Sequence, residues 1–310
     1  MGEVAIRLEG VTRDFGAVRA VDDLSLEVPA GVVFGFLGPN GSGKTTTIRL
    51  LLGLLEPTIG HAWVMGLDSV AQGERVRATS GALLEHTGLY ERMSAQDNLE
   101  YYARIWNLSE SDRKARVREL LEDAALWDRR KETVQGWSRG MKQKLAIARV
   151  LVHRPSVIFL DEPTAGLDPV AAAALREDLA QLASREGATI FLTTHNLSEA
   201  ERLCAQVAVI RKGKLLAAGK PEELRAGDGV AKAEVIGRGF SDGLLEAMRA
   251  RPEVASVDAS EGRLSIGLNG DVSLAPLVSM MVGAGAEVEE VRRVHASLEE
   301  AFMTLMEEDQ

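Results

Sequence analysis

The chain has 310 residues, which is room for two ordinary domains, and its 45% hydrophobic content is enough for sizeable cores. A net charge of −10 and a pI near 5.2 argue against a protein held on DNA or RNA by general electrostatics. Cys204 is the only cysteine, which excludes an intrachain disulfide and a cysteine-based metal cluster and favours a reducing compartment. The N-terminus lacks a signal-peptide pattern, and no apolar run approaches the ~18–20 residues of a membrane helix. A role at a membrane would therefore need another chain to span it.

The first 65 residues show several strand patterns and one helix pattern. Alternating apolar and polar residues predict two half-buried strands, and a turn carrying Phe15 is expected between them at Thr12–Gly16. A continuous apolar run then predicts a buried strand, which a helical pattern follows. We expect strands at 5–9, 24–28, 32–37 and 61–65 and a helix at 46–53.

The middle of the chain, from about 88 to 150, is helical and charged in composition, which predicts a helical insertion. Ser94 can cap one helix, Ser109 or Ser111 a second, and Arg139 begins a third. Beyond this insertion, continuous apolar runs are typical of central strands in a parallel sheet. We expect such strands at 156–160 and 188–193, a helix at 169–185 that links them into a βαβ unit, and a hairpin of 207–210 with 214–217.

The pattern changes after about residue 222, and 230–310 is predicted to be a small second domain. Its order of strand, helix, two strands, helix and strand is the split βαβ, or ferredoxin-like, arrangement. We expect strands at 230–236, 253–258, 263–268 and 286–292, and helices at 241–250, 273–283 and 297–307.

Residues Gly38–Thr45 match the phosphate-loop pattern G-x-x-x-x-G-K-[ST] between a strand and a helix. Glycines let the backbone N–H groups wrap around phosphates, and the N-terminus of the next helix favours anions. Lys44 can reach the β- and γ-phosphates of a nucleotide, and the Thr45 hydroxyl can ligate Mg²⁺. The alternative is a glycine-rich turn without a ligand, which the complete motif and its flanks disfavour. The expected nucleotide contacts are Gly38, Pro39, Asn40, Gly41, Ser42, Gly43, Lys44, Thr45 and Thr46.

A second motif, Val157–Glu162, places two carboxylates directly after a buried strand. Asp161 emerges at the carboxyl end of the strand, where ligands of open α/β sheets bind, and can hold Mg²⁺. Glu162 is placed to polarise an attacking water. An ordinary helix entrance is the alternative, which the phosphate loop in the same chain disfavours.

Four motifs together resemble the ATP-binding cassette (ABC) ATPases, and the resemblance covers the chain to about residue 220. They are Gly38–Thr45, Trp137–Leu145, Leu160–Asp168 and Leu192–His195, in the family's order. The chain closely resembles cassettes of the daunorubicin-resistance and sodium-export type, in which the ATPase is a chain separate from the membrane subunit. Ser297–Met303 also resembles the tail of that subgroup.

The resemblance implies a signature loop that closes over ATP held by a second subunit. Ser138, Arg139, Gly140 and Met141 occupy that loop. Arg139 stands for the family's first glycine and Met141 for its glutamine, whereas Ser138 and Gly140 keep the phosphate-contacting residue types. Ser138 and the Gly140 backbone would then donate to the γ-phosphate across a two-fold interface.

Four further residues receive roles from the same resemblance. Asp168 matches the D-loop that lines the interface, and His195 matches the switch histidine that contacts the γ-phosphate and orients water. Phe15 matches the aromatic that stacks on adenine, although an aromatic in a turn is often only packing. Glu85 replaces a glutamine that contacts Mg²⁺ and the attacking water; a surface glutamate with no role is the alternative.

We therefore expect an α/β fold of the P-loop NTPase (ABC ATPase) type with a mixed central sheet, an N-terminal antiparallel β subdomain and a helical insertion. The cassette would cover 1–222, and a small α+β domain would follow at 230–310. The resemblance implies a cytoplasmic ATPase subunit of an ABC transporter, an exporter in our interpretation, that uses ATP and Mg²⁺. It would act as a homodimer, peripheral on the inner face of the cell membrane through a separate transmembrane permease, with no nucleic-acid partner.

The sequence leaves three points open. A non-transport ABC ATPase acting on ribosomes or DNA is one alternative, although the single cassette and the lack of long coiled coils disfavour it. A regulator that binds ATP without hydrolysing it is another, and the intact Glu162 and His195 speak against it. In the insertion, Tyr101, Tyr102, Trp106 and Trp127 either pack its core or face a groove for the membrane subunit's coupling helix.

Overall fold

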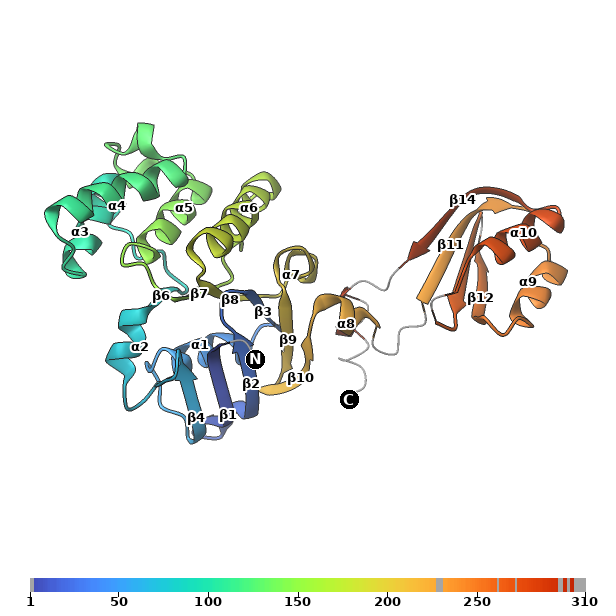
Figure 1. Ribbon diagram of the computed structural model, residues 1–310, viewed down its shortest axis with the longest axis horizontal. Coiled ribbons are helices and arrows are strands. Elements are labelled where there is room, and N and C mark those ends of the chain that lie inside the picture. Colours follow the sequence, from blue (N-terminus) through green and yellow to red (C-terminus); the bar gives the residue numbers. More distant parts are fainter. Residues whose placement is uncertain are drawn as a thin grey trace. The chain divides into compact units, whose positions relative to one another are not determined.

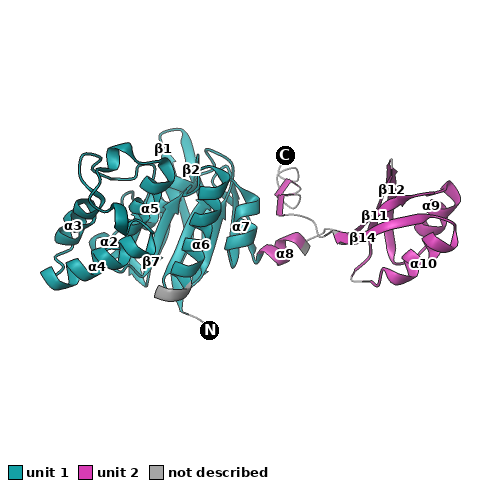
Figure 2. Cartoon of the chain, turned by 90° about the horizontal axis from the view of Figure 1, so that it is seen from above, with its two compact units in different colours: residues 1–220 teal, residues 221–310 magenta. Residues whose placement is uncertain are grey.

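The computed structural model describes residues 3–226, 231–260, 262–270, 272–294, 298–299 and 302–303. The chain divides into two compact units, Met1–Lys220 and Pro221–Gln310 (Figure 2). The larger unit carries two sheets and a group of helices, and the smaller one carries a third sheet (Figure 1). Among the described residues, none of the helices combines the length and the apolar character that crossing a bilayer requires.

The first sheet of the larger unit has the strand order β2-β1-β4-β5 and is antiparallel. The turn expected at Thr12–Gly16 begins later, at Gly16–Ala17, because β1 continues to Phe15, which pairs with Val18 of β2. This end of the strand is rich in polar residues, which in the sequence resemble a turn. In the structure they pair across the strands, where Arg19 Nε donates to Asp14 Oδ1 at 2.9 Å. The strands are β1 (Val4–Phe15), β2 (Val18–Pro29), β4 (Ile59–Val64) and β5 (Leu67–Asp68).

The second sheet has the order β10-β9-β3-β8-β7-β6, and all of its neighbouring strands except β10 and β9 run parallel. Four phenylalanines, Phe34, Phe36, Phe159 and Phe191, fill the centre and are at most 1% exposed. The carboxyl ends of the parallel strands meet along one edge, which is where ligands of such sheets bind. The strands are β3 (Val33–Leu37), β6 (Ser80–Leu83), β7 (Val157–Asp161), β8 (Thr189–Thr194), β9 (Gln206–Arg211) and β10 (Lys214–Gly219). The accompanying helices are α1 (Lys44–Leu51), α2 (Gly73–Thr79), α6 (Pro169–Glu186) and α7 (Leu197–Leu203).

Three helices, α3 (Ala95–Ile105), α4 (Glu110–Asp123) and α5 (Arg139–Val150), form the helical insertion (Figure 1). Each begins at a serine whose hydroxyl accepts a hydrogen bond from the backbone three residues later, and these serines are Ser94, Ser109 and Ser138. Ser109 rather than Ser111 therefore caps the second helix. Short 3₁₀ helices at Trp127–Arg129 and Val134–Gly136 connect α4 to α5.

The smaller unit begins with α8 (Pro221–Ala226) and has the sheet order β12-β13-β11-β14, antiparallel throughout. This order and the sequence of strands and helices are those of the ferredoxin-like arrangement. The strands are β11 (Ala231–Arg238), β12 (Val254–Ser260), β13 (Arg263–Leu268) and β14 (Glu287–Val294), and the helices are α9 (Asp242–Arg249) and α10 (Ala275–Gly283). The mixed sheet, the antiparallel subdomain, the insertion and this α+β unit confirm the expected fold class. The helix expected at 297–307 falls mostly outside the described residues.

Candidate active site

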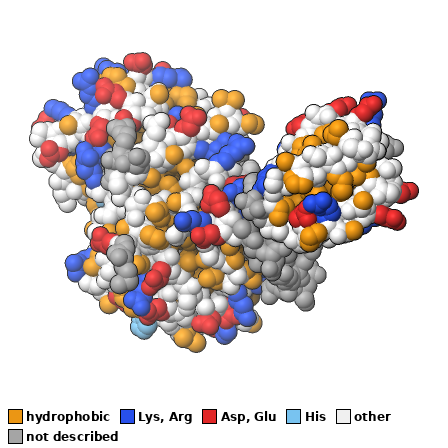
Figure 3. Space-filling model, turned by 45° about the vertical axis from the view of Figure 1, so that its right-hand side comes forward, with side chains coloured by type: hydrophobic (Ala, Val, Ile, Leu, Met, Phe, Trp, Pro, Cys, Tyr) orange, Lys and Arg blue, Asp and Glu red, His pale blue; other side chains and the backbone are white. Residues whose placement is uncertain are grey.

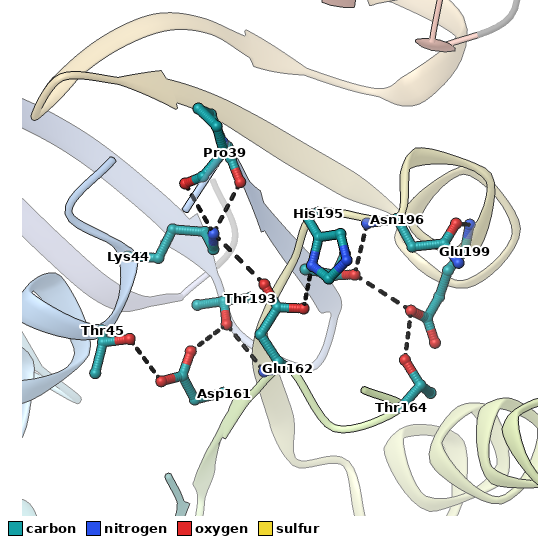
Figure 4. A network of polar contacts seen from close by, with 12 residues as sticks. Pro39, Lys44, Thr45, Asp161, Glu162, Thr164, Thr193, His195, Asn196 and Glu199 are labelled. Carbon is teal, nitrogen blue, oxygen red and sulfur yellow. Dashed lines mark hydrogen bonds and ion pairs between the residues drawn. The ribbon is translucent and has the colours of Figure 1, made fainter. Parts of the chain in front are cut away.

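The phosphate loop joins β3 to α1 and curls around the side chain of Lys44, which is 6% exposed. The Lys44 ammonium donates to the Gly38 carbonyl at 2.8 Å and to the Pro39 carbonyl at 3.2 Å (Figure 4). Gly43 has a φ of +106°, and a Cβ at this position would lie 2.4 Å from the Ala20 carbonyl oxygen. Only glycine fits there, so the loop can pass close to the neighbouring strand and hold its lysine at the centre.

Asp161, the last residue of β7, brings together side-chain oxygens from three elements. Its Oδ2 accepts a hydrogen bond from the Thr45 hydroxyl of α1 at 2.7 Å, and its Oδ1 accepts one from the Thr193 hydroxyl of β8. Parallel pairing places Asp161 opposite Thr193 and so creates this group. Hard oxygen donors of this kind suit Mg²⁺. The oxygens of Thr45 and Asp161 are therefore suited to bind the magnesium ion that accompanies a nucleoside triphosphate.

Glu162 follows directly and has a φ of +50°, which is uncommon for a residue with a side chain. Its backbone N–H donates to the Thr193 carbonyl at 3.2 Å and to the Thr193 hydroxyl at 3.1 Å. A backbone in this region costs about 1–3 kcal/mol, so the surrounding contacts must hold it. The strained turn directs the carboxylate into the site, where Oε1 lies 3.5 Å from Lys44 Nζ.

His195 lies directly after β8, and its Nδ1 is 2.8 Å from Glu162 Oε2 (Figure 4). The His195 side chain is 61% exposed, whereas that of Glu162 is 23% exposed. Glu162 Oε1 is buried and has no hydrogen-bond partner among the described residues, although the Lys44 charge is near. A carboxylate with one free oxygen and a histidine on the other can accept a hydrogen bond from a water at the pocket.

A pocket of about 450 Å³ opens at these strand ends, and this volume lies within the range of small-molecule sites. The predicted residues on its wall are Asn40, Gly41, Gly43, Lys44, Thr45, Thr46, Glu85, Arg139, Asp161 and Glu162. The predicted residues that are not part of this wall are Phe15, Gly38, Pro39, Ser42, Ser138, Gly140, Met141, Asp168 and His195. The structure thus brings the phosphate loop and both carboxylates together, while most of the signature loop lies elsewhere.

The signature loop and the D-loop form the adjoining starts of two helices. Ser138 caps α5, and Asp168 caps α6 by accepting hydrogen bonds from the backbone of Val170 and Ala171. A Cβ on Gly140 would lie 3.2 Å from the Ala171 Cβ, so the two helix starts are close. These two loops therefore form one surface of the larger unit.

Glu85 and Phe15 each have a cationic neighbour. Glu85 is 60% exposed, and its Oε1 accepts a hydrogen bond from Arg49 Nη2 at 2.9 Å. Phe15 is 44% exposed, and the Arg13 guanidinium lies 4.6 Å from its ring centroid. The roles of both residues stay predictions.

Two polar residues of this region have roles that the sequence motifs did not predict. Gln143 lines the pocket, and its amide donates to the Pro163 carbonyl at 2.6 Å, which ties α5 to the segment after Glu162. Thr193 holds both Asp161 and the Glu162 backbone. The polar Thr193-Thr194 pair at the end of an apolar strand was the available signal.

Comparisons with known proteins agree with this geometry. The family model described as "ABC transporter" matches residues 21–165. The daunorubicin resistance ATP-binding protein DrrA3 of Streptomyces coeruleorubidus is 36% identical over all of this chain and 98% of its own length. This chain belongs to the ATP-binding proteins of ABC transporters. It is therefore an ABC ATPase, as the sequence motifs predicted.

Two more similarities extend the comparison. The Nod factor export ATP-binding protein I of Cupriavidus metallidurans is 37% identical over 97% of this ABC ATPase and 96% of its own length. The structure of cbiO1 from Clostridium perfringens, part of the ABC transporter complex cbiONQ, has a TM-score of 0.68 and 26% identity over 73% of this chain and 92% of its own. These findings support the transporter interpretation and not the alternative of an ABC protein acting on ribosomes or DNA.

Proposed function

We propose that two copies of this ABC ATPase close around two ATP molecules and that hydrolysis drives a separate membrane protein. The observation that carries this proposal is the division of the phosphate-binding groups. Lys44 and Glu162 line the pocket, whereas Ser138 and Gly140 at the start of α5 are not on its wall, unlike Arg139 between them. A two-fold axis would bring each α5 N-terminus to the pocket of the other subunit. The free N–H groups of a helix N-terminus favour an anion such as the γ-phosphate.

In the pocket and beside it, each predicted side chain has a proposed task. Lys44 binds the phosphates through its charge, and Glu162 accepts a proton from the attacking water while His195 fixes the orientation of the carboxylate. Thr45, Asp161 and Glu85 would hold Mg²⁺, which neutralises charge on the phosphates when bound. Phe15 would stack on the adenine.

The proposed membrane partner docks on an exposed aromatic surface of the insertion. Tyr90 and Tyr101 pack edge to face with their ring centroids 5.0 Å apart, and they are 46% and 40% exposed. Ile105 is 53% exposed on the same helix as Tyr101. Exposed apolar side chains that gather in this way mark interaction sites. By contrast, Trp106 stacks on His153 with 3.8 Å between ring centroids, which favours packing as its role.

We propose that the direction of transport is export. The supporting observation is the names of full-length relatives, which refer to daunorubicin resistance and to Nod factor export. We expect no nucleic-acid partner: on the face in Figure 3, Lys and Arg side chains are interspersed with Asp and Glu rather than gathered in a basic patch.

The substitution Glu162→Gln tests the proposal. The variant should bind ATP, hydrolyse it at least ~10²-fold more slowly, and accumulate an ATP-bound dimer on gel filtration, because only the positioned base is lost. Glu74→Gln, an exposed glutamate on α2, is the matched control and should behave like the wild-type protein. Normal turnover by Glu162→Gln would remove this residue from the proposed mechanism.

A further inference from the structure

Glu199 is a carboxylate buried to 2% exposure, four residues after His195 on α7. It is not on the wall of the ATP pocket, so it has no direct contact to offer a nucleotide there. Buried carboxylates lose hydration and are kept only where other groups hold them. The contacts of Glu199 therefore indicate what it does.

The position of Glu199 in its helix would allow a capping box, in which the carboxylate reaches back to the N-cap backbone N–H. The Asn196 side chain does accept from the Glu199 N–H at 3.1 Å, but the Asn196 N–H donates to the Thr194 hydroxyl at 3.0 Å instead. The Glu199 carboxylate turns inward, away from the capping role. Its Oε2 accepts hydrogen bonds from the Thr164 hydroxyl at 2.8 Å and from the Thr194 hydroxyl at 3.3 Å (Figure 4).

These two threonines flank the catalytic pair. Thr164 comes two residues after Glu162, and Thr194 directly precedes His195. Since His195 Nδ1 also contacts Glu162 Oε2, the contacts close into a ring that runs through the two loops and Glu199. Glu162 has a left-handed backbone, which needs support from the chain on both of its sides.

Thr193 supplies support on one side by accepting from the Glu162 N–H. On the other side, Thr164 is tied to Glu199. The second oxygen of Glu199, Oε1, is buried without a hydrogen-bond partner among the described residues. A half-satisfied buried carboxylate is a poor choice for stability alone, which favours a role in the site.

We propose that Glu199 is a positioning residue for ATP hydrolysis, which holds the turn of Glu162 and the turn of His195 in one arrangement by accepting hydrogen bonds from Thr164 and Thr194. This proposal rests on the roles proposed above for Glu162 and His195. A small displacement of a catalytic group lowers the reaction rate by a large factor. A change at Glu199 would leave the phosphate loop, which binds ATP, as it is. The turnover number should therefore depend on Glu199 while ATP affinity does not.

Four variants of the full-length protein test this proposal by steady-state ATPase assays and calorimetric ATP titration. Glu199→Ala should lower kcat roughly 10²-fold and change the Kd for ATP less than about threefold. Glu199→Gln keeps an acceptor oxygen and should stay within about tenfold of the wild-type kcat. Thr164→Val should lower kcat about tenfold, and Thr164→Ser, which restores the hydroxyl, should recover most of it.

A double-mutant cycle separates positioning from independent effects. Because Thr164 and Glu199 act through one contact, the double variant Thr164→Val/Glu199→Ala should be no slower than Glu199→Ala alone. Ser198→Ala, on the exposed side of the same helix, is the matched control and should keep the wild-type kcat. If Glu199→Ala does not fold, the comparison of Thr164→Val with Thr164→Ser still decides.

Three results would overturn the proposal: wild-type turnover by Glu199→Ala, losses that multiply in the double variant, or a Kd that rises as much as kcat falls. Glu162→Gln measured in parallel distinguishes the two proposals. If Glu162→Gln hydrolyses ATP normally, the role proposed for Glu162 fails, and the premise of the Glu199 proposal fails with it. If it is inactive while Thr164→Val and Glu199→Ala are normal, only the role of Glu199 fails.

Discussion

The two compact units bury different kinds of side chain. The larger unit encloses polar and charged groups, including Lys44, Asn98, Arg116, Thr193 and Glu199, whereas the described residues of the smaller unit bury no polar or charged side chain. Buried polar groups are costly unless they are bonded, so a fold carries them where they have a task. In the larger unit several of these groups lie at a strand end, as Thr193 does, or in the insertion, as Asn98 and Arg116 do. The smaller unit has an apolar core.

The largest expected effect concerns the buried charge of the phosphate loop. Lys44→Ala should weaken ATP binding roughly 100-fold or more, about 2.7 kcal/mol, because it removes a charge-assisted contact to the phosphates. Lys114→Ala, an exposed lysine on α4, is the control and should leave affinity unchanged. Titration calorimetry measures both, and an unaltered affinity of Lys44→Ala would show that the anchor of the site has been misinterpreted.

The next effect concerns the edge of the pocket. Glu85→Gln should keep ATPase activity within roughly tenfold, about 1.4 kcal/mol in barrier, because an oxygen remains for Mg²⁺. Glu85→Ala should lose more activity and also the coupling to the membrane protein, while ATP affinity falls less. Arg49→Ala removes the partner of Glu85 outside the pocket wall and separates loss of the ion pair from loss of the oxygen. Wild-type ATPase and transport by Glu85→Ala would leave this residue without a role.

A smaller effect should appear in the pH dependence of stability. Burial lowers the pKa of His153, whose Nε2 donates to the Ser80 carbonyl at 3.0 Å. The unfolded chain binds this proton more readily, so the folded state loses stability as pH falls below about 6.5, the ordinary histidine value. His153→Phe, which keeps a ring beside Trp106, should show a smaller fall of Tm between pH 7.5 and 5.5. An identical fall in both proteins would contradict this account of His153.

The smallest effect is expected from removing the smaller unit. A chain of residues 1–220 should bind ATP within about threefold of the full-length affinity, because each unit has its own core. The reactivity of Cys204 reports whether the shortened chain is folded. Burial raises the pKa of this thiol, and the nearby Glu199 carboxylate raises it further. The thiol should therefore resist alkylation at neutral pH until urea unfolds the chain. Rapid labelling of the shortened chain in buffer would mean that the units depend on each other.

The sequence was sufficient for the parts of the site that are local in the chain. The phosphate loop, Asp161 and Glu162 follow from a motif and an adjacent apolar strand, because a few consecutive residues determine their backbone. The helix starts at Ser94 and Ser138 follow from capping in the same way. The end of β1 was missed, because its polar residues carry the turn signal while the pairing with β2 decides the structure.

The remaining parts depend on contacts between distant residues. Thr193 meets Asp161 only because β7 and β8 pair in one register, 32 residues apart in the chain. The inward orientation of the Glu199 carboxylate likewise depends on Thr164, which follows the carboxyl end of β7. The sequence around Glu199, taken alone, predicts a capping box. Such residues require the fold before their role can be stated.

The central claim, that each ATP site is completed by the signature loop of a second copy, has one direct test. Lys44→Ala inactivates the pocket of its own chain, and Ser138→Asp keeps the cap of α5 while its charge repels the γ-phosphate. Each variant alone should show little ATPase activity. In a 1:1 mixture about half of the dimers combine the two variants and carry one intact site, so about a quarter of the wild-type activity should return. No recovery in the mixture would contradict the account.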